Sequence, residues 1–197
     1  MSSSATPSPV RTGAAHLGRS IVVMGGLLVL LWALEGFDTL IGGRLDWYGI
    51  HARDVDGLPG ILTAPLLHAG WGHLISNSAP FFVLGLLVLL SGLARWIWSS
   101  LISIVSSGLT AWLLTPPGTV IIGASGLIFG WLTYLLARGL WSGKIGQVLI
   151  AAAVLLFYGG MIVGIMPGAA GVSWQAHLGG AVGGVFAAWL LHRRPAR

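Results

Sequence analysis

The chain has 197 residues, 55% of them hydrophobic and only 8% charged, and its mean hydropathy of +0.88 excludes a soluble globular domain. Ten Lys and Arg against five Asp and Glu give a net charge of +5. In a membrane protein this excess marks cytoplasmic loops, so the composition predicts a lipid bilayer, and not nucleic acid, as the partner.

Six apolar runs are long enough to cross a hydrocarbon core about 30 Å thick, and they predict an all-α membrane protein built as a compact six-transmembrane-helix bundle. The runs cover residues 20–41, 73–92, 96–114, 120–137, 145–166 and 173–192. We expect residues 1–18, rich in Ser, Pro and Thr, to form a disordered cytoplasmic N-terminus. Residues 19–192 then form one six-span domain, and residues 193–197 a basic cytoplasmic tail.

The connection formed by residues 42–72 is the longest between these runs. It contains several glycines, two prolines and the aromatic residues Trp47, Tyr48 and Trp71. A loop of this length in so compact a protein is expected to be functional, or to lie on the membrane as a partly helical, half-submerged element.

The distribution of basic residues predicts the orientation of the chain. Eight of them fall on one side of the membrane if the six runs cross in turn: Arg11, Arg19, Arg95, Arg138, Lys144, Arg193, Arg194 and Arg197. The opposite side has two, Arg44 and Arg53. The positive-inside rule therefore places both termini in the cytoplasm, as expected for a multi-pass protein of a bacterial inner membrane.

Four polar side chains are predicted to lie at one depth in the bundle. His73 and Asn77 are four residues apart at the start of the second run, which places them on one helical face. Ser125 is about five residues into the fourth run and His177 about four into the sixth. Because these runs all cross from outside to inside, the four groups lie on the order of 7 Å below the outer surface.

Pairs of glycines predict that the fourth and sixth runs touch. Gly126 and Gly130 are four residues apart, as are Gly180 and Gly184. Small residues at this spacing let helix backbones approach closely. The contact would lie just beneath Ser125 and its partner on the sixth run.

Each of these features also has a purely structural interpretation. Ser125 can bond back to a carbonyl of its own helix. His73 and Asn77 can form a hydrogen-bonded pair that joins two helices. The glycines can serve packing alone, and that role is compatible with holding a site in register.

If the site is hydrolytic, elimination leaves one mechanism. The chain has no cysteine, no His-Glu-x-x-His run, and no acid after residue 57 that could supply an aspartyl pair in the later runs. What remains is a dyad in which Ser125 is the nucleophile and His177 the general base, with no metal and no cofactor. His73, the Asn77 amide and the Ser125 backbone N–H are the available oxyanion donors.

Three motifs in this order resemble those of the rhomboid family of intramembrane serine proteases. They are His68-x4-His73-x3-Asn77, Gly123-x-Ser125-Gly126 and Ala176-His177-x2-Gly180-x3-Gly184. The segments from Tyr48 to Arg53 and from Gly60 to His68 also resemble the first loop of bacterial members, so that the likeness covers residues 20–192.

The resemblance implies a serine endopeptidase that cuts a peptide bond in or near the outer end of a substrate transmembrane segment. It implies Ser125 as nucleophile, His177 as base, and His73 and Asn77 at the oxyanion hole. His68 would order water or the loop, and Gly123, Gly126 and Gly180 would support the site. The expected partners are single-span membrane proteins and the lipid bilayer, and the sequence does not indicate an oligomeric state.

Two other classes of protein are weighed against this one. A catalytically inactive rhomboid-like protein that binds membrane clients is the alternative, and the joint presence of Ser125, His177, His73 and Asn77 argues against it. A small transporter or channel would need charged or polar residues lining the spans deep in the membrane, and we interpret runs two to six as carrying none beyond the site itself.

Overall fold

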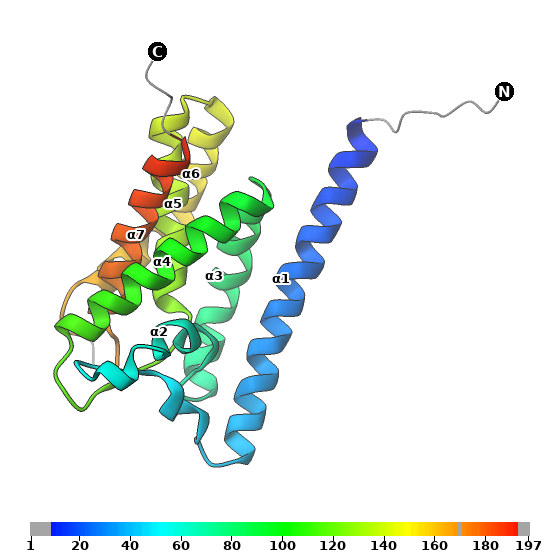
Figure 1. The fold of residues 1–197 in the computed structure, drawn as a ribbon. Coiled ribbons are helices and arrows are strands. Elements are labelled where there is room, and N and C mark those ends of the chain that lie inside the picture. Colours follow the sequence, from blue (N-terminus) through cyan, green and yellow to red (C-terminus); the bar gives the residue numbers. More distant parts are fainter. Residues whose placement is uncertain (1–8, 169–170, 193–197) are drawn as a thin grey trace.

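The computed structural model describes residues 9–168 and 171–192, which form a helical bundle (Figure 1). The long helices are α1 (Pro9–Leu40), α3 (Trp71–Leu89), α4 (Leu93–Leu114), α5 (Ser125–Ser142), α6 (Ile145–Tyr158) with its 3-10 extension η4 (Gly159–Ile165), and α7 (Trp174–His192). Helix α1 stands to one side of the bundle and packs along α3. An all-α membrane bundle is thus confirmed.

Four helical segments in the described part of the chain are long and apolar enough to cross a membrane. They are Gly13–Leu40, Trp71–Leu89, Leu93–Leu114 and Ile145–Ile165. Helices α5 and α7 correspond to the fourth and sixth predicted runs, and they are not among these four segments. That all six helices cross the bilayer therefore stays a prediction.

Two predicted boundaries differ from the structure. Residues 9–18, expected to be disordered, belong to α1, while residues 1–8 and the tail 193–197 lie outside the described residues. The fourth run was expected to be helical from residue 120, but α5 begins only at Ser125. The β-branched residues Val120 and Ile121 form the short strand β2 instead, since such side chains favour an extended backbone.

Helix α5 lies at the centre of the bundle. Twelve of its eighteen residues are buried, and Ile128, Trp131 and Tyr134 belong to the main hydrophobic core. Residues of α3 and α7, among them Leu84 and Ala187, complete that core. A helix enclosed in this way gives a rigid base for any side chain at its first turn.

Helices α5 and α7 touch through their glycines, as the spacing predicts. A Cβ atom on Gly180 would collide with the carbonyl oxygen of Gly126, and one on Gly184 with that of Gly130. Hydroxyl groups of α4 also bond to carbonyl groups of α7. Ser107 Oγ donates to the Ala176 carbonyl at 2.8 Å and Ser106 Oγ to the Gly179 carbonyl at 2.7 Å.

The 42–72 connection is partly helical, as expected, and is tied to the segment that precedes α5. It contains η1 (Leu45–Tyr48), β1 (Ile50–His51), η2 (Val55–Gly57), α2 (Gly60–Thr63) and η3 (Ala64–Leu66). Strand β1 pairs antiparallel with β2 (Val120–Ile121), with Ile50 opposite Ile121. The loop therefore reaches to within a few residues of Ser125.

Candidate active site

Ser125 is the first residue of α5, directly after a turn that only glycine fits. Gly123 has φ +120°, a conformation that side chains rarely adopt, and its N–H donates to the Ala64 carbonyl at 2.8 Å. A Cβ at Gly123 would also come within 2.5 Å of the His73 ring. The turn therefore places Ser125 at the start of α5, and the His73 ring packs against Gly123 of this turn.

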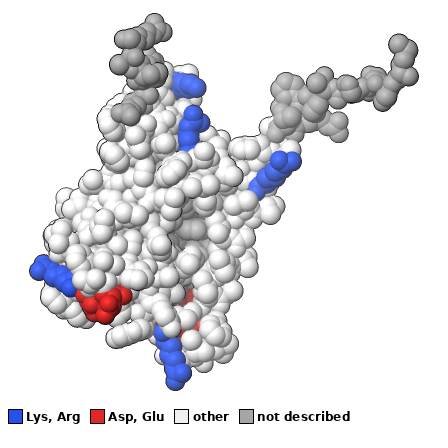
Figure 2. Space-filling model, viewed as in Figure 1, with Lys and Arg blue, Asp and Glu red and all other residues white. Residues whose placement is uncertain are grey.

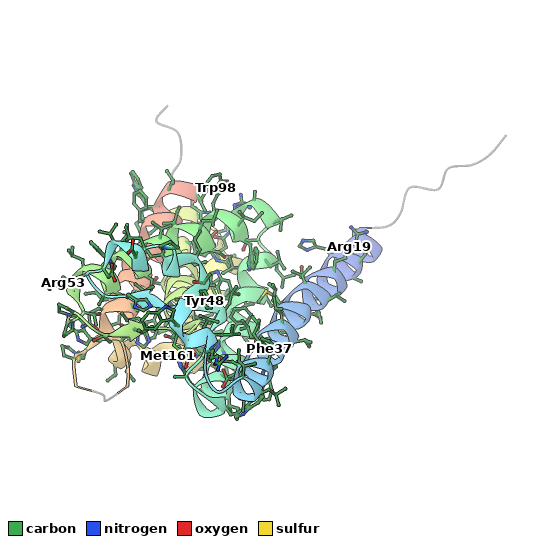
Figure 3. The ribbon with its side chains drawn as sticks, turned by 60° about the horizontal axis from the view of Figure 1, so that its bottom comes forward. Arg19, Phe37, Tyr48, Arg53, Trp98 and Met161 are labelled. Carbon is green, nitrogen blue, oxygen red and sulfur yellow. The ribbon has the colours of Figure 1, made fainter. Side chains whose placement is uncertain are left out.

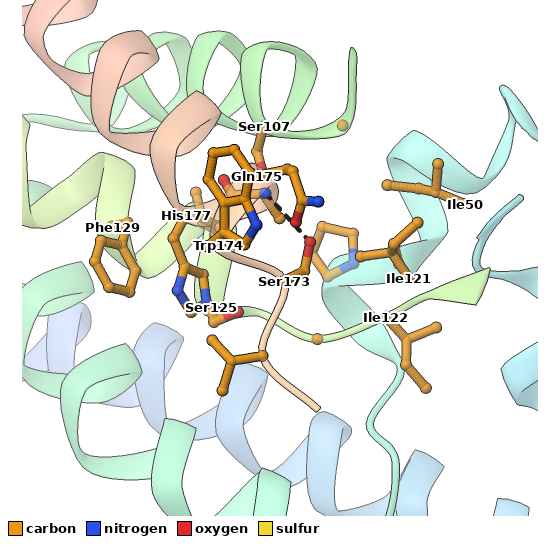
Figure 4. Close-up of a pocket in the computed structure, with 18 of the residues that line it drawn as sticks. Ile50, Ser107, Ile121, Ile122, Ser125, Phe129, Ser173, Trp174, Gln175 and His177 are labelled. Atoms are coloured by element: carbon orange, nitrogen blue, oxygen red, sulfur yellow. Dashed lines mark hydrogen bonds between the residues drawn. The ribbon is translucent and has the colours of Figure 1, made fainter. Parts of the chain in front are cut away.

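His177 is the fourth residue of α7, and its ring faces Ser125 (Figure 4). Its Nε2 lies 2.8 Å from Ser125 Oγ. The first turn of α7 is fixed by Ser173, whose side-chain oxygen accepts from the Ala176 N–H at 3.3 Å. The two side chains come from sequence positions 52 residues apart, and the glycine contact of α5 and α7 brings them together.

The second ring nitrogen of His177 determines which nitrogen carries the proton. Nδ1 lies 2.9 Å from the carbonyl oxygen of Gly164 in η4. A carbonyl can only accept, so Nδ1 carries the hydrogen of the neutral imidazole and Nε2 keeps its lone pair. Nε2 is then the acceptor and the Ser125 hydroxyl the donor. In a catalytic triad a carboxylate has this orienting role.

Phe129 fixes the plane of the His177 ring. The two rings are stacked, with centroids 4.2 Å apart and planes at 13°. Phe129 is one helical turn after Ser125 on α5 and is buried. Gly164 leaves room for this arrangement, because a Cβ there would come within 3.0 Å of Phe129 and 3.2 Å of His177.

Ser125 and His177 line a cavity of about 650 Å³ together with the other predicted site residues His73 and Asn77 (Figure 4). Asn77 is buried, and its side-chain nitrogen donates to the His73 carbonyl at 2.9 Å. That bond uses one of its two N–H groups, so the second is free to donate elsewhere.

His68 lies behind His73 and does not line the cavity. The two rings meet edge to face, with centroids 5.1 Å apart. His68 is 2% exposed, and its ring nitrogens have no hydrogen-bond partner among the described residues. Burial, with the neighbouring His73 as a smaller cause, lowers the pKa of His68 to about 4, so this side chain is neutral at pH 7.

The structure brings together the four side chains that the sequence predicts, and it adds two partners that the sequence does not reveal. Gly164 contributes a backbone carbonyl, which every residue has. Phe129 contributes one ring in a chain full of apolar residues, and only its spacing of four from Ser125 could have pointed to it. In the part of the chain that the structure describes, no three side chains of His, Cys, Asp or Glu cluster to hold a metal.

Fold and site together define a multi-pass helical membrane protein that holds a serine–histidine pair inside its bundle. The model of the rhomboid domain matches residues 56–194, a range that contains all four side chains, and the chain belongs to the rhomboid family.

Relatives with similar sequences occur in mycobacteria and in a plant. An uncharacterized protein of Mycobacterium tuberculosis is 47% identical over 182 residues, which are 86% of this chain and 76% of that protein. An uncharacterized protein of Mycobacterium leprae is 44% identical over 172 residues, 83% of this chain and 68% of that protein. The chloroplastic rhomboid-like protein 11 of Arabidopsis thaliana is 33% identical over 153 residues, 68% of this chain and 52% of that protein.

Proposed function

We propose that the protein is an intramembrane serine protease that uses the Ser125–His177 dyad. The observation that carries this proposal is the contact of 2.8 Å between Ser125 Oγ and His177 Nε2, with Nδ1 oriented by the Gly164 carbonyl. A hydroxyl is a weak nucleophile until a base accepts its proton, and this geometry supplies the base in the correct tautomer. Membership of the rhomboid family supports the same function.

The proposed reaction proceeds through an ester on Ser125. Ser125 Oγ attacks the scissile carbonyl carbon while His177 Nε2 takes the hydroxyl proton. The tetrahedral intermediate breaks its C–N bond, and His177 returns the proton to the leaving amine. Water, activated by the same nitrogen, then hydrolyses the ester and restores the serine hydroxyl.

The oxyanion of the tetrahedral intermediate is stabilised by hydrogen-bond donors that line the cavity around Ser125. His73 and Asn77 of α3 line the cavity beside Ser125. The backbone N–H of Ser125 is one of the N–H groups that a helix leaves unpaired in its first turn. Donors fixed in advance around a developing negative charge are a large part of the rate gained in acyl transfer.

The proposed substrate is a single transmembrane segment, cut near its outer end after a small residue. Peptide carbonyls within a helix are bonded to their own backbone, so the segment must unwind locally, and glycine or proline lowers that cost. The distribution of basic residues supports an orientation in the bacterial inner membrane with both termini cytoplasmic and all six long helices crossing. The cavity then faces the outer side.

Labelling with a fluorophosphonate, which reacts with activated serines, tests the dyad directly. We expect one label on Ser125 in the purified protein, located by peptide mass spectrometry, and none in Ser125→Ala. Ser76→Ala is the matched control, because Ser76 lines the same cavity but its hydroxyl donates to the His73 carbonyl and not to a histidine ring. An unlabelled wild-type protein that still binds a transmembrane peptide would favour the inactive client-binding alternative.

Cleavage of a reconstituted single-span peptide tests the substrate. Replacing its glycine and proline residues with leucine is expected to slow cleavage strongly, and the product ends should map to the outer half of the segment. Undiminished cleavage, or ends on the cytoplasmic side, would refute this part of the proposal.

A further inference from the structure

Arg138 is a buried cation at the end of the bundle opposite the Ser125–His177 pair. The sequence suggests a loop charge between two spans, but the structure places Arg138 in the last turns of α5 with 2% of its surface exposed. One Nη donates to Ser91 Oγ, and the guanidinium lies 5.9 Å from the centre of the Tyr134 ring. Its Nε has no hydrogen-bond partner in the described part of the chain.

Three further basic side chains lie at this end of the bundle, one from α4, one from α7 and one from the turn before α6. Arg95 in the first turn of α4 is exposed and donates to the Ser91 carbonyl at 2.7 Å. His192 at the end of α7 lies 2.8 Å from the Tyr134 hydroxyl. Lys144 precedes α6 and is exposed. Arg138 and Arg95 both bond to Ser91, and Arg138 and His192 both lie against Tyr134. Lys144 lies close enough to act electrostatically on His192, and we call these four groups the basic cluster.

The chain supplies no carboxylate side chain to balance this charge. All five acidic residues precede residue 57. On the face shown in Figure 2, the acidic side chains lie at the lower end of the molecule, away from the C-terminal ends of α5 and α7. About 20 Å of helix separates Ser125, near that end, from Arg138. Among the described groups that act electrostatically on Arg138, none is an Asp or Glu.

A buried cation without an anion is costly, because removal from water is offset only by pairing and hydrogen bonds. We propose that the basic cluster binds the phosphodiester group of an anionic phospholipid. Arg138 would provide the buried charge, while Arg95 and Lys144 at the rim donate to the phosphate oxygens. This binding site lies outside the proposed catalytic site and does not depend on it.

The surroundings of the basic cluster favour a lipid over free phosphate. Leu93, Leu140 and Ile145 flank it and are strongly exposed. Exposed apolar side chains of this kind next to a basic rim match the acyl chains and the headgroup of one molecule. Basic pockets between transmembrane helices on the cytoplasmic side are a common form of anionic lipid site.

Native mass spectrometry of the detergent-solubilised protein, titrated with phosphatidylglycerol, tests the proposal. We expect wild-type protein to retain the lipid, with zwitterionic phosphatidylcholine bound far more weakly. Loss of one charge in Arg138→Gln should weaken the apparent Kd about fivefold, and Arg138→Lys should restore most of it. Should Arg138→Gln fail to fold, the double variant with Arg95→Gln and Lys144→Gln, both at exposed positions, should weaken it by about 25-fold.

Arg19→Gln is the matched control. Arg19 is exposed on α1, which stands to one side of the bundle (Figure 1, Figure 3), and its replacement removes the same charge from the chain. It should leave the Kd unchanged. Equal retention of the two lipids, or equal weakening by Arg19→Gln and Arg138→Gln, would overturn a specific site. Inorganic phosphate that displaces phosphatidylglycerol at millimolar concentration would show an ion site and would overturn the lipid assignment.

Discussion

Helices α6 and α7 both pack against α5, but they do so in opposite ways. Helix α7 buries ten of its nineteen residues, its glycines touch the α5 backbone, and α4 hydroxyls bond to its carbonyls. Helix α6 buries only Val154 of its fourteen residues, and Phe157 is 78% exposed. One neighbour of α5 is fixed in register by backbone contact, while the other is held by a few side chains.

This difference matters because His177 has one hydrogen bond on each side. Its position relative to Ser125 depends on the tight α5–α7 contact, whereas its Nδ1 proton is held by Gly164 of η4, the extension of the loosely packed α6. The α5–α7 contact therefore determines the distance between Ser125 Oγ and His177 Nε2, and the loosely packed α6 and η4 determine the tautomer of His177. The following predictions test this division, beginning with the largest expected effect.

Replacing His177 with alanine removes both hydrogen bonds of the ring, the one to Ser125 and the one to Gly164. We expect peptide cleavage to fall by about 10⁴-fold or more, because nucleophile and base act as a unit. Circular dichroism should show a folded protein. His16→Ala, at the exposed start of α1, is the control and should keep full activity. Substantial turnover by His177→Ala would remove the basis of the division.

His73→Ala and Asn77→Ala change the part of the cavity lining that α3 provides. Each should lower kcat by about 10²–10³-fold, the usual cost of losing one oxyanion donor. Fluorophosphonate labelling of Ser125 should persist in both, since the dyad is intact. A rise in KM with kcat unchanged would mean that these side chains bind substrate without stabilising the transition state.

The variants Phe129→Ala and Phe157→Ala compare the buried ring on α5 that stacks on His177 with an exposed ring on α6. Phe129 is buried against His177, so its loss should cost about 3–5 kcal/mol of unfolding free energy and reduce turnover. Phe157 on α6 is mostly exposed, and its replacement should change neither quantity appreciably. Equal losses in reversible unfolding would contradict the contrast between the two helices.

Gly180→Ala adds a methyl group to α7, and Gly146→Ala adds the same group to α6. On Gly180 it would meet the Gly126 carbonyl, whereas nothing lies within 4 Å of a Cβ on Gly146 in α6. We expect the first change to cost about 1–3 kcal/mol and the second to be neutral or slightly stabilising. Melting curves of the two variants, measured in one detergent, give the comparison.

The smallest effect concerns His68 in the loop beyond the cavity. Its folded pKa of about 4 lies below the ordinary value of 6.5, so the unfolded chain binds the proton first as the pH falls. Stability from this group is fully present above pH 6.5 and is lost toward pH 4, amounting to about 1 kcal/mol between pH 7 and 5.5. His68→Gln should show a correspondingly smaller loss over that interval. An identical pH dependence would show that another group dominates.

The sequence predicted the parts of this molecule that depend on length, polarity and spacing. A bilayer fixes the length of an apolar helix, so the long helices were visible as apolar runs. Ser125 and His177 stood out because polar side chains are few inside such runs. The sequence did not predict the start of α5, because an apolar β-branched stretch reads alike as helix or strand. Arg138 was read as a loop charge, since nothing in its neighbours reveals that the helix continues past it and buries it.

The pairing of β1 with β2 has a consequence for the order in which the protein is made. Ile121 leaves the ribosome 71 residues after its partner Ile50, a delay of about 4–14 s at ordinary rates of synthesis. His177 follows Ser125 by a further 52 residues. The nascent chain thus inserts its serine well before the imidazole that would activate it. The proposed hydrolytic pair is therefore complete only after translation has passed the start of α7.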